Sequence, residues 1–327
     1  MKVGNWLVLS AGCLVVLAVA GTSAHALHAA PDHSREFDPA AGPTFALRGS
    51  IGMLNGEGGE YVYNGSHKLS ELTWDLSQLL MAGLVFSARI NERFSLNAGF
   101  WTALNDGNGE MTDYDWFIEG MDWTHYSRSD VKVESARVFD INADCMVLER
   151  GNFRLSALAG YKHEFWEWSD EFYEYIYSSF MPPAYVRDIR GNMGGVSAID
   201  YEQTYNIPYV GLNAAGRFGH NLNWSVYFLY SPIVKAEDKD HHKLRDDFGP
   251  GGIHYEGTFK NIDYIAFGAT AAVQINDNLQ LGGQLHAQNV PESRGDMYIV
   301  EADETFKDAA GISHDSVTVS LTAIWSF

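Results

Sequence analysis

Two short stretches of the sequence carry side chains that could activate a water molecule. The first, DYDW, contains Asp113 and Asp115, and the second, DKDHH, contains Asp240 and His242. Residues i and i+2 of an extended segment point to the same side, so each pair presents two groups together. A carboxylate beside a histidine fixes the imidazole tautomer and stabilises the imidazolium, as a general base requires. Two crowded carboxylates raise the pKa of one member. The two pairs together could deprotonate a water held between His242 and Asp113 for attack on a carbonyl group.

Spacing alone leaves two other interpretations open. Acidic pairs are common in solvated loops, above all in a chain with 42 Asp and Glu against 22 Lys and Arg. The second interpretation is a metal site, because His241, His242 and Asp246 lie close together in the chain. However, the HExxH spacing of zinc proteases is absent from the sequence, and adjacent histidines in a charged run are usually solvated, so we expect no metal.

The N-terminus has the organisation of a secretory signal peptide. Lys2 is followed by an apolar segment over 6–20 and by the small-residue motif Ala-His-Ala at 24–26. These features predict cleavage of residues 1–26 and leave 27–327 as a single exported domain. Lipidation at Cys13 is an alternative, but the apolar run continues past this residue.

Charge and cysteine content limit the possible ligands and covalent cross-links of the protein. The formal net charge is −20, which disfavours nucleic acid as a partner and favours cationic ligands. Once the signal peptide is removed, Cys145 is the only cysteine, so a disulfide within the chain is excluded. Apolar runs of 18 residues are absent after the signal peptide, so a membrane-spanning segment would have to be a strand of a β-barrel.

The C-terminal stretch SVTVSLTAIWSF alternates apolar and polar residues and ends in an aromatic residue. This pattern is typical of the last strand of an outer-membrane barrel, with one face toward lipid and the other toward the lumen. Similar alternation predicts an all-β, ten-stranded antiparallel transmembrane barrel with strands at 44–55, 70–90, 94–105, 130–149, 153–168, 197–217, 222–236, 254–275, 279–291 and 312–327.

Short and long connections alternate between these strands. The short turns should face the periplasm, and the long connections, which carry both candidate pairs, should face the outside. Aromatic residues near strand ends, such as Phe100-Trp101 and Phe165-Trp166-Glu167-Trp168, suggest an interfacial aromatic girdle.

These features resemble the omptin family of outer-membrane proteases over nearly the whole mature chain. MTDYDW is similar to the family's D-x-D-W segment, and DKDHH is similar to its D-x-D-x-H segment. The resemblance implies an endopeptidase with His242 as general base and Asp240 as its orienting group. It also implies that Asp113, backed by Asp115, positions the attacking water.

The resemblance further implies a cationic substrate and a lipid partner. The family favours cleavage between or after basic residues, and its recognition acids match Glu60 and Asp238. Its lipopolysaccharide-binding positions match Tyr161 and Lys260, and lipopolysaccharide is its activator. The chain is expected to act as a monomer in the bacterial outer membrane, with its active site facing outward.

This chain departs from the family at three further lipid-binding positions. His163, Phe165 and Thr204 occupy places where the family has one acidic and two basic residues. Loss of two arginine-type contacts should weaken a bidentate grip on phosphate, so we expect weaker lipopolysaccharide dependence or a different lipid A. Ser127 matches a position well populated in the family, and we interpret it as structural or cleft-lining, not as a nucleophile.

Three rival functions remain open at this stage. A non-catalytic adhesin would use the acidic loops to hold cationic ligands. A lipid A-modifying enzyme would require a Ser/His pair on the lipid-facing wall, which the sequence does not suggest. A passive pore is disfavoured because the lumen of a ten-stranded barrel is largely filled by side chains.

Overall fold

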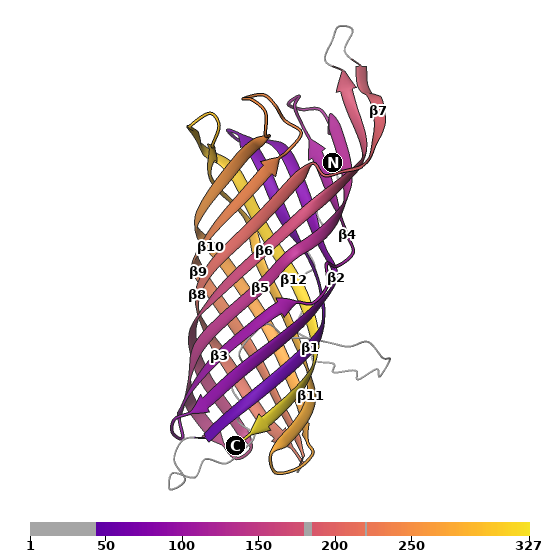
Figure 1. Cartoon of the computed structure of the whole chain (residues 1–327). Helices are drawn as coiled ribbons and strands as arrows, with labels where there is room; N and C mark the ends of the chain where they lie inside the picture. The colour runs from indigo at the N-terminus through magenta and orange to yellow at the C-terminus, as the bar shows by residue number, and fades with distance from the viewer. Residues whose placement is uncertain (1–43, 180–184, 220) are drawn as a thin grey trace.

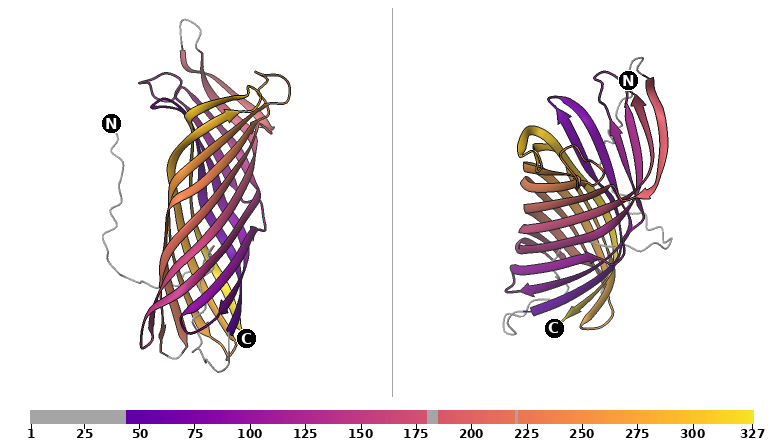
Figure 2. Two further views of the ribbon diagram at one scale, coloured as in Figure 1. Left: turned by 90° about the vertical axis from the view of Figure 1, so that its left-hand side faces the viewer. Right: turned by 45° about the horizontal axis from the view of Figure 1, so that its top comes forward.

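The computed structural model describes residues 44–179, 185–219 and 221–327, so the predicted signal peptide at 1–26 lies outside the described residues. The described chain forms one tall barrel (Figures 1 and 2). Its strands are β1 (Thr44–Asn64), β2 (His67–Arg89), β3 (Phe94–Ala103), β4 (Gly109–Asp115), β5 (His125–Arg150), β6 (Phe153–Ser179), β7 (Tyr185–Val196), β8 (Ile199–Phe218), β9 (Leu222–His242), β10 (Ile253–Gln274), β11 (Leu279–Ile299) and β12 (Glu304–Ser326). A search of the described residues for membrane-spanning helices finds none.

The barrel closes where β1 pairs with β12, from Ala46 opposite Ser326 to Val62 opposite Ala310. Every other ring contact is antiparallel as well, so the predicted ring of ten strands is confirmed. The twelve strands fill ten ring positions because two of those positions hold interrupted strands. Both β3 and β4 lie between β2 and β5, at different heights, and are separated by residues 104–108. In the same way, β6 pairs with β8 along its first part and with β7 near its end, where β7 rises above the rim (Figure 1).

The outer ends of the strands reach further than predicted. β1 continues to Asn64 and turns directly into β2 through Gly65, which has φ of +59°. β11 and β12 likewise continue to a short connection at 300–303, and β9 continues through His242. The prediction that both candidate pairs lie in loops is therefore wrong: Asp113 and Asp115 lie on β4, and Asp240 and His242 lie on β9. The residues of these upper strand segments are polar, so their sequence resembles that of a loop. In the structure they pair as regular strands.

The short turns at the other end are as predicted, and asparagine side chains stabilise two of them. Asn91 Oδ1 accepts hydrogen bonds from the backbone N–H groups of Arg93 and Phe94, both at 2.9 Å. Asn276 Oδ1 accepts from Asn278 and Leu279, both at 3.0 Å. This is how asparagine mimics a backbone turn, so each strand reversal needs only a few residues.

The strand faces follow the alternation of the sequence, with one correction. On β12, Val317, Leu321 and Trp325 are exposed, whereas the alternate polar side chains and Ile324 are buried. The predicted girdle is wrong for three tryptophans, because Trp101, Trp166 and Trp168 are buried inside the barrel (1%, 0% and 0% exposed). Exposed aromatic residues near the outer wall include Phe100, Tyr161, Phe218 and Trp325.

The outer wall changes character along each long strand. On β9, the exposed residues are apolar from Leu222 to Ile233, and charged residues follow from Lys235 onward. A strand needs only about 9–11 residues to cross a bilayer, whereas β9 has 21. The apolar zone fits the lipid layer, so the half of the barrel that contains Asp240 and His242 stands in water outside it.

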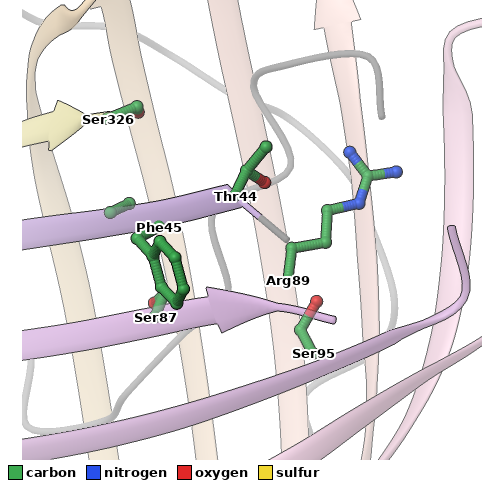
Figure 3. Close-up of a pocket in the computed structure, with 7 residues that line it drawn as sticks. Thr44, Phe45, Ser87, Arg89, Ser95 and Ser326 are labelled. Atoms are coloured by element: carbon green, nitrogen blue, oxygen red, sulfur yellow. The ribbon is translucent and has the colours of Figure 1, made fainter. Parts of the chain in front are cut away.

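Side chains fill the lumen below this upper half. Lys162 is fully buried and contacts Glu164 at 3.1 Å, the Tyr264 hydroxyl at 2.8 Å and Gln288 at 2.9 Å. At the far end, a pocket too small for a substrate lies where β1 begins and β12 ends (Figure 3); it is lined by residues that include Thr44, Phe45, Ser87, Arg89, Ser95 and Ser326.

Candidate active site

The upper half of the barrel contains a cleft of about 520 Å³ that brings the two predicted pairs together. Asp113 and Asp115 line it from β4, and Asp240 and His242 line it from β9. The i, i+2 spacing directs both members of each pair inward, as predicted. Asp113 and His242 lie close enough for their charges to interact, so two strands on different walls share one reaction space.

His242 is held by Asp240. Its Nε2 lies 2.6 Å from Asp240 Oδ2, and the Asp240 carboxylate is only 5% exposed, whereas the imidazole is 22% exposed. Donation of the Nε2 proton to Asp240 leaves a lone pair on Nδ1. Burial lowers the pKa of His242, which keeps the ring neutral and able to accept a proton.

The carboxylates on the other wall are tuned by burial and by two serines. Asp113 accepts hydrogen bonds from Ser70 Oγ at 3.1 Å and from Ser127 Oγ at 3.5 Å. Burial raises the pKa of Asp113, while the Ser70 bond, His242 and Arg245 oppose that rise. Burial and the neighbouring Asp113 raise the pKa of Asp115 to about 8, so at neutral pH this pair keeps a proton.

Glu60 and Asp238 lie in the upper barrel beside the β9 pair. Both are buried, at 7% and 8% exposure. Trp74 Nε1 donates to Glu60 at 3.2 Å. Asp238 accepts from the Tyr201 hydroxyl at 3.2 Å and from the Gly257 backbone at 2.7 Å. Glu60 lines the cleft, whereas Asp238 is buried and does not line it. We call this side of the cleft the acidic pocket; its buried carboxylates would suit a cationic side chain.

Gly257 is required by this arrangement. A Cβ atom on Gly257 would lie 2.2 Å from Asp238 Oδ1. Only glycine lets the β10 backbone approach the carboxylate closely enough to donate its N–H.

The pKa values of both Glu60 and Asp238 are raised. Burial, with the nearby Asp240 and Asp238, raises the pKa of Glu60 well above its usual range. Burial raises the pKa of Asp238 to about 7. A bound arginine or lysine would favour the ionised forms, because an opposite charge nearby lowers a carboxyl pKa.

Resistance to unfolding should therefore fall as pH rises. Unfolded Asp238 titrates near 3.8 and folded Asp238 near 7, so between these values the folded chain binds more protons. The free energy of unfolding then decreases with increasing pH, by about 1.4 kcal/mol for each unit of pKa shift. We expect the urea midpoint in detergent to fall from pH 5 to pH 8, and to fall less in Asp238→Asn. A midpoint that rises with pH, or an equal fall in the variant, would contradict this assignment.

One set of side chains in the described chain could hold a metal ion. Donor atoms of Glu60, Asp240 and His242 lie within 4.8 Å of one another. The cluster considered from sequence is not assembled, because His241 points away from His242, stacks on His254 at 3.9 Å and bonds the Gly251 carbonyl.

Several residues around the cleft could not be found from sequence. Trp74 and Tyr201 stack at 5.2 Å and each donates to a pocket acid, but both look like ordinary strand aromatics in the sequence. Arg245 lines the cleft and bonds the Tyr255 hydroxyl at 2.9 Å. The only feature of the sequence that points to Arg245 is its position three residues after His242. Tyr161 and Lys260, the predicted lipid-binding residues, lie away from the cleft on β6 and β10.

Comparisons with known proteins show the family of the chain. The profile of the omptin family matches residues 42–327. The plasminogen activator of Yersinia pestis is 30% identical over 294 residues, covering 87% of this chain and 90% of the relative. The outer membrane protease OmpP of Escherichia coli is 31% identical over 202 residues, covering 60% of this chain and 63% of the relative.

A solved structure has the same fold. The crystal structure of the outer membrane protease OmpT from Escherichia coli superposes with a TM-score of 0.80 at 25% identity, covering 90% of this chain and 99% of OmpT. The expected fold, enzyme class and outer-membrane location are confirmed by these matches. The chain belongs to the omptin family of outer-membrane proteases.

Proposed function

We propose that this protease cleaves peptide bonds at arginine or lysine residues by direct attack of water. Asp240 and His242 supply the base, Asp113 and Asp115 position the water, and Glu60 and Asp238 bind the basic side chain. The observation that carries the proposal is the cleft itself, where an Asp–His pair and an Asp–Asp pair lie on different walls together with Glu60, and Asp238 is buried close to Glu60.

The proposed reaction needs only these groups and one water. His242 Nδ1 takes a proton as the water oxygen attacks the carbonyl carbon, and Asp240 stabilises the imidazolium through Nε2. The imidazolium then protonates the departing nitrogen as the C–N bond breaks. The products are a carboxylate and an amine, and His242 returns to its neutral form. Ser127 donates to Asp113 and makes no hydrogen bond to a histidine in the part of the chain that the structure describes, which fits a positioning role better than a nucleophilic one.

A pair of matched peptides tests the substrate class. Refolded protein should cleave a fluorogenic peptide containing Arg-Arg, and mass spectrometry should place the cut after arginine. The same peptide with Gln-Gln should be cleaved at least about thirtyfold more slowly, because a buried charged pair is worth about 2 kcal/mol or more. Equal cleavage of both peptides would contradict recognition by Glu60 and Asp238.

The outer wall supports a role for lipopolysaccharide phosphate. Tyr161 is 40% exposed and donates to Asn206 at 2.5 Å. Lys260 on β10 lies directly opposite Lys235 on β9, and Lys235 in turn lies opposite Asn206. Like charges directly opposite one another are destabilising, and an anion between them relieves the repulsion.

We expect lipopolysaccharide to stimulate this protease only modestly. His163 bonds to Asn206 at 3.0 Å, and Phe165 and Thr204 carry no charge. The proposed phosphate-binding site therefore lacks a planar guanidinium group. Activity of refolded protein should be measurable without lipopolysaccharide and should rise severalfold when it is added. A strict requirement at low lipopolysaccharide concentration would contradict the proposal.

A further inference from the structure

The cleft has a second wall whose chemistry differs from that of the acidic pocket. It consists of Phe117, His125, Phe172 and Tyr177, which we call the aromatic wall. The His125 ring lies 5.0 Å from Phe117 and 4.8 Å from Tyr177. These residues come from the β4–β5 connection, β5 and β6, so none belongs to the strands that carry Glu60 or Asp238.

The aromatic wall and Glu60 lie on opposite sides of β4, the strand that carries Asp113 and Asp115. Along the ring, β1 with Glu60 is followed by β2 and β4, then by β5 with His125 and β6 with Tyr177. Consecutive side chains of an extended peptide point in opposite directions. A peptide with one side chain directed at Glu60 would therefore direct the next across the reacting groups toward the aromatic wall.

The charges near this wall disfavour a second cation. Asp115 lies opposite His125 in the β4–β5 pairing, but it is crowded against Asp113 and belongs to the reacting pair. Burial lowers the pKa of His125, so the ring is neutral. Arg245 adds a positive charge to the same cleft. Asp170 lines the cleft too, but it is 2% exposed and accepts from Ser129 and from two backbone N–H groups.

We infer that the cleft selects a basic residue before the cut bond and an apolar or aromatic residue after it, with His125 and Tyr177 as the specificity-determining residues. The inference rests on the proposed function and narrows it. A site with recognition carboxylates on both sides would favour dibasic sequences, whereas the aromatic wall itself contributes no carboxylate. The preferred substrates are then peptides in which arginine or lysine precedes a large apolar residue.

Peptides that differ at one position test the inference. Arginine is kept before the bond, and the next residue is phenylalanine, valine, lysine or aspartate. We expect kcat/KM for phenylalanine and valine to exceed that for lysine by roughly tenfold, as one well-matched pocket contact allows. Equal or faster cleavage of the arginine–lysine peptide would overturn the inference, because the aromatic wall would then be binding a cation through its ring faces.

Substitutions in the aromatic wall and at a control position test whether the wall sets the preference for the residue after the cut bond. His125→Asp should reverse the order and favour lysine, whereas His254→Asp makes the same change at the exposed rim and should leave the order unchanged. Tyr177→Ala, tested in parallel, should reduce the preference for phenylalanine and retain the requirement for arginine. An unchanged order in both wall variants would overturn the assignment of these residues. If wild-type protein cleaves none of the four peptides, the proposed function itself fails and the inference falls with it.

Discussion

Replacement of His242 by alanine will lower kcat for an arginine-containing peptide by about 10²–10⁴, the usual contribution of a general base. The imidazole is the only group in the cleft with a neutral nitrogen bonded to a buried carboxylate, among the residues that the structure describes. KM should change little, because His242 is proposed to act on water and the acidic pocket is left intact. Stopped assays with the refolded variant measure both constants.

The neighbouring histidine offers a matched control. His241 follows Asp240 directly but points to the opposite face of β9 and stacks on His254. His241→Ala should retain wild-type kcat within about twofold, as surface changes usually do. Comparable losses in both variants would show that the assay reports disturbance of β9 and not the loss of a base.

The second large effect is expected at Glu60. Glu60→Gln should lower kcat/KM for arginine substrates by roughly thirtyfold or more, because an arginine bound there would lose one partner of a buried charge pair. Stability should not fall, since the native pocket crowds Glu60 with Asp240 and Asp238. Parallel measurements of peptide cleavage and urea unfolding check both statements.

Glu57→Gln is the corresponding control on the same strand. Glu57 is exposed on the outer face of β1, three residues before Glu60. Its replacement should leave arginine selectivity unchanged. If Glu60→Gln retains full selectivity while Asp238→Asn loses it, Asp238 alone forms the recognition site.

The barrel could be predicted from sequence because its signal is local. Alternation along β12 places Val317, Leu321 and Trp325 on the lipid face, and the structure agrees. The sequence did not predict that the strands extend into the upper half of the barrel, because the local signal is lost there. Around Glu57 and Asp238 both faces of the strand are polar, one toward water and one toward the cleft, so alternation disappears and the segment resembles a loop.

The residues of the proposed site could be predicted only in part. The i, i+2 pairs were recognisable because each lies in one short stretch, and the resemblance to omptins added Glu60. The residues that support them depend on contacts between distant strands. Trp74 reaches Glu60 across 14 residues, and Tyr201 reaches Asp238 across 37, so neither contact has a local pattern. The aromatic wall likewise joins β5 to β6 at their far ends.

The claim at the centre of this account is that one water is shared between β4 and β9. The most direct measurement is a crystal structure of the protein with a bound arginine peptide whose scissile bond cannot be cleaved. The account predicts an ordered water within about 3 Å of both His242 Nδ1 and an Asp113 oxygen, facing the carbon at the scissile position. A peptide bound with that carbon against the Ser127 hydroxyl, and with no room for a water between the two strands, would contradict it.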